Sequence, residues 1–307
     1  AGGDVVWTDL HCAGSNQDMD DEEYLARVAW MPDNTLTAQI LNRSHSRLKL
    51  LKFDIRTGSR KVILVEENEV WINLHDCFTP LQKGFDMLTG GFIWASERTG
   101  FRHLYLYDCN GVCLSPLTQG DWMVEQIAGV DEVSGQVYFI GTLDSPLETH
   151  LYSTKLFPDP SLPLLKPKKL TQGEGRHVVV LDHQMRRFVD MHDSLHTPPR
   201  VVLCSLEDGK GLIPLYEQPT PTPRARKLQL CAPETVEITT SDATILYGAL
   251  YKPDAKLFGP PPYKTLVSVY GGPNVQTVSN TWMNTVDMRA QYFRSKGILV
   301  WRVTANP

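Results

Sequence analysis

Short apolar runs of strand length alternate with turn residues from position 24 to position 216. The run 137–142 combines β-branched and aromatic residues between polar and glycine positions. The dipeptides Thr57-Gly58 and Asn110-Gly111 supply the positive φ that tight hairpins need. No part of this stretch has the 3.6-residue apolar stripe of a helix. The pattern predicts consecutive antiparallel hairpins.

The hairpins repeat at a long period. Four similar segments begin at Arg47, His103, His150 and Arg200, with spacings of 56, 47 and 50 residues. The tetrapeptide Leu-Thr-Gln-Gly occurs at 117–120 and again, 53 residues later, at 170–173. Such spacing is typical of propeller blades, each a four-stranded antiparallel sheet. The alternative, a β-sandwich, has turns every 8–12 residues and lacks a long period.

About four blades occupy residues 24–216, whereas propellers have about four to eight. Residues 1–23 form an acidic lead-in with no clear pattern and offer no strand to precede the first blade. A closed four-bladed ring is one interpretation. The lead-in favours the other, a larger propeller of which this chain holds a part.

The pattern changes after a Pro-rich linker at 217–234. Strands are predicted at 235–240, 244–251, 265–270 and 298–303. A helix is predicted at 282–296, with Gly297 as its C-cap. Strand, helix and strand in succession indicate an α/β sheet. Residues 235–307 are therefore predicted to be the first, incomplete part of an α/β domain.

Composition restricts the function classes. Apolar content of 42% and charged content of 21% are those of a globular protein, and a net charge of −5 disfavours nucleic-acid partners. No run is long enough to cross a bilayer. The six scattered cysteines favour a reducing compartment, hence the cytoplasm, although a disulfide between Cys109 and Cys113 would fit their hairpin. Neither a Walker A motif nor Gly-x-Gly-x-x-Gly is present, and no cofactor is expected.

The candidate active site lies at the end of the predicted strand 265–270, where Tyr270 is followed by Gly271, Gly272 and Pro273. An α/β-hydrolase builds half of its oxyanion hole after such a strand. The nucleophile motif Gly-x-Ser-x-Gly does not occur in the 307 residues. The sequence therefore predicts a hydrolase fragment that lacks its catalytic serine.

Several segments, in matching order, resemble the prolyl oligopeptidase family of serine peptidases. The resemblance is to the dipeptidyl peptidase IV group, and most of all to its cytosolic members, dipeptidyl peptidases eight and nine. The segments that carry it are 23–30, 71–76, 95–105, 141–148 and 269–276. It implies a propeller joined to an α/β-hydrolase domain. It also implies removal of N-terminal dipeptides with Pro or Ala in second place, and homodimers of the full-length protein.

The resemblance assigns roles to three residues. Tyr270 matches the family's oxyanion tyrosine, and Gly271 and Gly272 form the oxyanion loop. The family's Ser, Asp and His lie beyond the matched region, so this chain is expected to be inactive alone. The alternative is a non-catalytic propeller module that binds peptides or a full-length partner. Residues that bind substrate are not assigned.

Other conspicuous residues are predicted to be structural. Glu22-Glu23 resembles the family's amine-binding pair but stands at the wrong place, and the acidic runs 18–23 and 66–69 are predicted to be solvated. No metal site is predicted, because the dispersed histidines lack His-x-x-x-His spacing on a helix. The remaining assignments are structural roles for His75, Asp76 and His103; no metal at His177, His183, His192 and His196; and inter-blade packing for Trp30, Trp71, Trp94 and Trp122.

Overall fold

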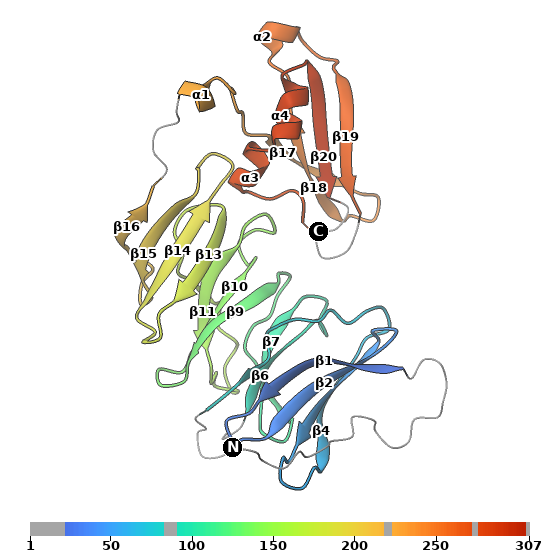
Figure 1. The fold of residues 1–307 in the computed structure, drawn as a ribbon, viewed down its shortest axis with the longest axis vertical. Coiled ribbons are helices and arrows are strands. Elements are labelled where there is room, and N and C mark those ends of the chain that lie inside the picture. The colour runs from blue at the N-terminus through green and yellow to red at the C-terminus, as the bar shows by residue number, and fades with distance from the viewer. Residues whose placement is uncertain (1–21, 83–90, 218–222, 272–275, 305–307) are drawn as a thin grey trace, which may run out of the picture. The chain divides into compact units, whose positions relative to one another are not determined.

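The structure is a computed structural model, and it describes residues 22–82, 91–217, 223–271 and 276–304 (Figure 1). Within these ranges the strands form five four-stranded sheets. Four of the sheets follow one another along the chain and have the form of propeller blades. The predicted lead-in lies almost wholly outside the described residues.

The first blade has the order β1-β2-β3-β4, and each neighbouring pair is antiparallel. Its turns are closed by short polar side chains. Asn42, for example, accepts hydrogen bonds through Oδ1 from the backbone N–H of Ser46 and Arg47, at 3.0 and 2.9 Å. The strands are β1 (Glu23–Trp30), β2 (Leu36–Asn42), β3 (Arg47–Phe53) and β4 (Arg60–Glu67).

The other three blades follow the same pattern, in the orders β5-β6-β7-β8, β12-β11-β10-β9 and β13-β14-β15-β16. The four repeated segments begin the third strands β3, β7, β11 and β15, which confirms the predicted repeat. The strands are β5 (Thr79–Pro80), β6 (Phe92–Ser96), β7 (His103–Tyr107), β8 (Cys113–Pro116), β9 (Val124–Asp131), β10 (Gln136–Gly141), β11 (His150–Lys155), β12 (Lys168–Lys169), β13 (Arg176–Leu181), β14 (Arg187–Asp193), β15 (Arg200–Ser205) and β16 (Gly211–Tyr216).

The first blade buries apolar side chains on both of its faces, as a blade with neighbours must. Ala38, Ile40, Leu51 and Phe53 form one cluster. A second cluster joins the first blade to the second, and it includes Leu41, Leu48, Leu50, Phe92 and Trp94. Burying these side chains is the main favourable contribution to the fold, at about 25 cal/mol per Å² of apolar surface.

Of the four tryptophans assigned to packing between blades, two fulfil the prediction. Trp94 and Trp122 are buried, with 1% and 7% exposure. The prediction is wrong for Trp30 and Trp71, which are 62% and 47% exposed. Trp30 ends β1, an edge strand of its sheet, and Trp71 stacks on His45 with ring centroids 3.9 Å apart.

The fifth sheet has the order β17-β18-β20-β19. β19 and β20 are parallel and are connected through helices, whereas β17-β18 and β18-β20 are antiparallel. This confirms the predicted start of an α/β domain. The elements are β17 (Glu234–Thr239), β18 (Ile245–Tyr251), β19 (Lys264–Tyr270), β20 (Ile298–Thr304), α1 (Pro223–Arg226), α2 (Ala255–Phe258), α3 (Trp282–Thr285) and α4 (Met288–Arg294).

The single helix predicted at 282–296 is in fact two, α3 and α4. The break comes at Asp287, whose carboxylate accepts from the backbone N–H groups of Arg289 and Ala290, both at 3.0 Å, and so starts α4 as its N-cap. Ser295, not Gly297, is the C-cap. Gly297, with φ of 78°, turns the chain just beyond it.

The chain divides into two compact units, residues 1–139 with 153–168 and residues 140–152 with 169–307. This division does not fall at 217–234, so the domain boundaries drawn from the sequence stay a prediction. In the part of the chain that the structure describes, no helix has the length and apolarity that crossing a bilayer requires.

Candidate active site and its supports

Tyr270 is the last residue of β19, at the carboxyl end of the parallel pair, and lies opposite Thr304 of β20. Ligand sites in α/β sheets form at this end of the strands. Strand alternation places Tyr270 on the same face as Leu266 and Ser268, and the residue is 44% exposed. Gly271 is also exposed, whereas Gly272 lies outside the described residues.

The strand that carries Tyr270 rests on a small apolar core. Leu266 packs against a buried cluster formed by Ala249, Tyr251, Val278, Ala290 and Val300. The helix α4 contributes to this core and lies against β20 and β18 (Figure 1). The backbone of the strand that carries Tyr270 is therefore anchored, and a hydrogen-bond donor for a developing charge requires such preorganisation.

Polar contacts beside this core hold the two helices to the sheet. The Tyr251 hydroxyl donates to the carbonyl of Asn284 at 2.7 Å, and burial raises the pKa of Tyr251 to about 12, so the hydroxyl stays a donor. Arg302 of β20 donates to Asn284 Oδ1 at 2.9 Å and pairs with Asp287. Burial alone would raise the pKa of Asp287, but hydrogen bonds from Ala290 and Arg302 outweigh it and hold that pKa below its usual value.

The segment before α3 is held by two acidic side chains that belong to the blades. The Asn280 side-chain amide donates to Glu148 Oε1 at 2.6 Å. Asp193 accepts from the Thr281 hydroxyl at 2.7 Å and from the backbone N–H of Trp282 at 2.6 Å. We call residues 280–282 together with Glu148 and Asp193 the acidic clamp. Sequence reasoning missed it, because its partners are 132 and 88 or 89 positions apart in the chain.

The acidic clamp continues into backbone contacts. The backbone N–H of Leu195 donates to Asn280 Oδ1 at 2.9 Å, and the Thr285 hydroxyl donates to the Leu195 carbonyl at 2.6 Å. The side-chain amide of Asn280 therefore donates through its nitrogen to Glu148 and accepts through its oxygen from Leu195. A side chain that donates and accepts at once fixes the orientation of its segment more firmly than a single contact does.

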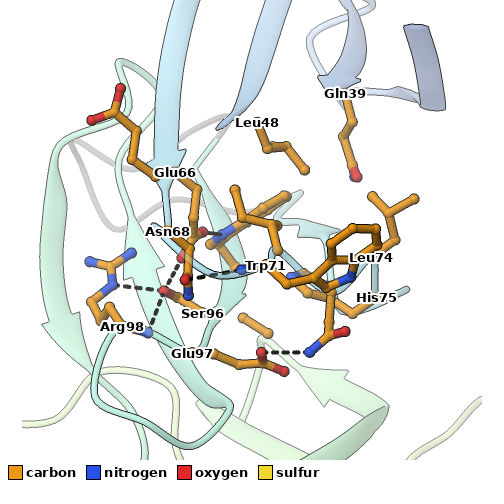
Figure 2. A pocket seen from close by; sticks show the side chains of 15 residues that line it. Gln39, Leu48, Glu66, Asn68, Trp71, Leu74, His75, Ser96, Glu97 and Arg98 are labelled. Atoms are coloured by element: carbon orange, nitrogen blue, oxygen red, sulfur yellow. Dashed lines mark hydrogen bonds between the residues drawn. The ribbon is translucent and has the colours of Figure 1, made fainter. Parts of the chain in front are cut away.

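A small pocket lies between the first two blades (Figure 2). Its cavity volume is about 30 Å³, room for about one water molecule. Glu66 accepts from Trp94 Nε1 at 2.6 Å and from the Ser96 hydroxyl, and Arg98 donates to Ser96 Oγ at 2.9 Å and to the Tyr107 hydroxyl at 2.5 Å. Because these groups satisfy one another and the space is small, the pocket does not admit a peptide. The prediction that the run 66–69 is solvated is wrong for Glu66.

The Glu22-Glu23 pair does not form a paired carboxylate site. Glu22 is exposed, but the side chain of Glu23 is only 17% exposed and lies 2.5 Å from Lys49 Nζ. The expectation that both are solvated is therefore wrong for Glu23. An ion pair within the blade leaves that carboxylate engaged and unavailable to a substrate amine.

The histidines assigned to structure have structural partners. His103 is buried and contacts Thr118 Oγ1 through Nδ1 and the Gly120 carbonyl through Nε2, at 3.0 and 2.8 Å. His75 accepts at Nδ1 from the backbone N–H of Cys77, at 3.2 Å. Burial, with the nearby Arg102, lowers the pKa of His75 to about 4, which keeps it a neutral acceptor. The thiols of Cys109 and Cys113 are both free.

Two of the four dispersed histidines come together with an aspartate. His177, Asp190 and His192 are all buried, and one potential ligand atom from each lies within 4.8 Å of the others. His183 and His196 are exposed. Helical spacing could not reveal this group, because its members lie on two neighbouring strands. The spacing Asp-x-His was the available signal, since residues two apart on a strand share a face.

The blades and the parallel strand pair with its terminal tyrosine define a propeller protein with the start of an α/β domain, and comparisons with known proteins give its family. The dipeptidyl peptidase IV N-terminal region matches residues 8–199. The chain therefore belongs to the dipeptidyl peptidase IV family, and the predicted propeller fold is confirmed.

Individual relatives support this family assignment. Human dipeptidyl peptidase 8 is 28% identical over 91% of this chain and 36% of its own length. A probable dipeptidyl peptidase 4 of Aspergillus flavus is 24% identical over 84% of the chain and 33% of its own. The crystal structure of Porphyromonas gingivalis dipeptidyl peptidase 4 superposes with a TM-score of 0.73 at 26% identity, over 94% of this chain and 39% of that one. The chain thus spans 33 to 39% of the length of these relatives.

Proposed function

We propose that the chain is the propeller part and the first catalytic-domain strands of a cytosolic serine-type dipeptidyl peptidase. The complete enzyme would remove dipeptides with Pro or Ala in second place from peptide N-termini, and the propeller would restrict access to the site. The position of Tyr270, exposed at the carboxyl end of β19 in a member of this family, is the observation that carries the proposal.

The role proposed for Tyr270 is to donate its phenolic hydrogen to the oxyanion of the tetrahedral intermediate. Gly271 and Gly272 would let the backbone turn close to the substrate carbonyl. The nucleophile and its general base would come from residues outside this sequence. By itself the 307-residue chain is expected to be inactive, since it holds no Gly-x-Ser-x-Gly motif.

The first experiment measures cleavage of a Gly-Pro fluorogenic substrate by the purified chain and by a chimera. The chimera is full-length human dipeptidyl peptidase 8 in which residues 1–303 of this chain replace the segment that they match. We expect activity from the chimera and none from the chain. Cleavage by the chain alone would contradict the absence of the nucleophile. An inactive chimera that is folded and reacts with a serine-directed phosphonate would favour a non-catalytic module.

The second experiment tests the phenol. In the chimera, Tyr270→Phe should lower kcat about 100-fold or more while leaving KM nearly unchanged, because the hydroxyl acts only on the transition state. Tyr292→Phe is the matched control, since Tyr292 is an exposed tyrosine on α4. Equal activity of the two variants would remove Tyr270 from the mechanism.

A further inference from the structure

Three side chains meet on one face of the fourth blade. His177 of β13 lies directly opposite His192 of β14 in the strand register. Asp190 stands two residues before His192, so strand alternation places both side chains on the same face. Figure 1 shows β13 and β14 side by side. A cross-strand pair with a third residue two positions away brings three side chains to one point.

The distances in this group are close to those of a tetrahedral metal site. His177 Nδ1 lies 3.0 Å from both carboxylate oxygens of Asp190, and His192 Nδ1 lies 3.3 Å from Asp190 Oδ2. Ligands about 2.1 Å from a tetrahedral Zn²⁺ stand about 3.4 Å from one another. Two of the three separations are therefore near this value, and the third is at most 4.8 Å.

The hydrogen bonding of the group is incomplete. The side chains of His177, Asp190 and His192 are 0%, 5% and 6% exposed. Nevertheless, His192 Nδ1, which is directed at Asp190, makes no hydrogen bond, and neither does His177 Nε2. A buried polar atom without a hydrogen bond is unfavourable. A cation between the two Nδ1 atoms and the carboxylate would remove that penalty at His192.

We propose that His177, Asp190 and His192 bind a divalent transition-metal ion of the Zn²⁺ type. Imidazole with one carboxylate suits Zn²⁺ and its neighbours, whereas Mg²⁺ and Ca²⁺ prefer oxygen-only sites. Each imidazole stays neutral on binding, because its hydrogen moves from Nδ1 to Nε2. The ion cross-links β13 to β14, and water completes its coordination.

Arg200 controls this site. Its Nε donates to His192 Nε2, and because arginine only donates, Nε2 is the unprotonated nitrogen and the ring hydrogen lies on Nδ1. A metal on Nδ1 requires the hydrogen on Nε2, where Arg200 has no lone pair to accept it. The ion therefore binds only when Arg200 turns away, which its half-exposed position on β15 allows. Its positive charge opposes the ion as well.

The third neighbouring histidine is not a ligand. The ring of His150 lies 4.8 Å from that of His177, but its Nδ1 contacts Thr171 Oγ1 and its Nε2 contacts Glu148 Oε2, both at 3.0 Å. The proposed site is thus limited to two nitrogens and one carboxylate of the blade.

The test measures Zn²⁺ binding by isothermal titration calorimetry and Co²⁺ binding by visible absorption. It uses the full 307-residue chain after treatment with EDTA, and every protein carries His183→Ala and His196→Ala, which remove exposed histidines. We expect one ion per chain, with a Co²⁺ spectrum of four-coordinate intensity. Asp190→Asn should weaken binding more than about 10-fold. Arg200→Met should tighten it about 10-fold, because it removes the positive charge and the donor to His192 Nε2, and groups beside a metal ligand alter affinity by factors of this size.

Two results would overturn the proposal. One is equal Zn²⁺ affinity in Asp190→Asn, in His192→Gln and in their parent, which would place any bound ion elsewhere. The other is an Arg200→Met protein that binds Zn²⁺ no more tightly than its parent. The second result decides the matter even if Asp190→Asn fails to fold, because Arg200→Met keeps every proposed ligand. Circular dichroism without metal confirms that the compared proteins are folded.

Discussion

The second and third blades contain the same hydrogen-bonded arrangement of a threonine and a histidine, but the outer contact of the histidine differs. In the second blade the backbone N–H of Leu104 donates to Thr118 Oγ1 at 2.9 Å, and Thr118 contacts His103 Nδ1. The third blade repeats this with Leu151, Thr171 and His150, at 3.2 and 3.0 Å. We call each set a Thr-His latch. In the second blade the threonine hydroxyl donates to Nδ1, because the Gly120 carbonyl can only accept and so places the hydrogen of the neutral His103 ring on Nε2.

The two latches differ at the outer nitrogen of the histidine. His103 Nε2 meets the backbone carbonyl of Gly120, so the second-blade latch closes on its own loop. His150 Nε2 meets Glu148 Oε2, and the other oxygen of Glu148 accepts from Asn280 in the acidic clamp. One repeated device therefore ends within its blade, while the other extends to the segment that precedes α3. A repeat unit can thus acquire a connecting role through the partner of one nitrogen.

The largest expected effect comes from removing the Glu148 carboxylate, which connects the third-blade latch to the acidic clamp. Glu148→Ala leaves His150 Nε2 and the Asn280 amide without their shared acceptor, and we expect the free energy of unfolding to fall by about 2–3 kcal/mol. Urea denaturation measures it. Glu174→Ala is the control, because Glu174 is an exposed glutamate of the same blade region, and its change should stay within about 0.5 kcal/mol. Equal losses in both variants would show that the extension carries no stability.

A smaller effect tests whether the latches themselves are equivalent. Thr118→Val and Thr171→Val keep the side-chain volume, and each removes the acceptor of a buried backbone N–H and the hydroxyl that contacts a histidine. We expect each to lower the free energy of unfolding by about 1–2 kcal/mol in urea denaturation, with the two values within about 0.5 kcal/mol of one another.

A much larger loss of stability in Thr171→Val than in Thr118→Val would mean that the third-blade latch and the acidic clamp act as one unit. Thr57→Val, in an exposed turn, is the control.

The sequence predicted the repeated segments that carry the latches, but not the contact that connects one of them to the acidic clamp. The duplicated Leu-Thr-Gln-Gly and the period of the third strands reflect local hairpin geometry, which a chain repeats whenever it repeats its residues. Glu148 meets Asn280 across 132 positions, and no local pattern specifies that distance. The break between α3 and α4 was missed for another reason, since Asp287 competes with the helix by capping its own successors. The position of Tyr270 followed directly from the strand pattern.

The smallest expected effect is on the pH dependence of stability, and it distinguishes the buried His103 of the second-blade latch from an exposed histidine. Burial lowers the pKa of His103 and outweighs the Gly120 carbonyl and Asp121, which raise it. The unfolded chain therefore binds a proton at a higher pH than the folded one. The His103 contribution is complete above the unfolded pKa of about 6.5 and is lost as pH falls towards the folded value, with a slope of at most about 1.4 kcal/mol per pH unit. His103→Gln should flatten the stability curve below that pH. His183→Gln, at an exposed histidine, should leave the slope as it is, and parallel slopes in all three proteins would show that His103 does not titrate with folding.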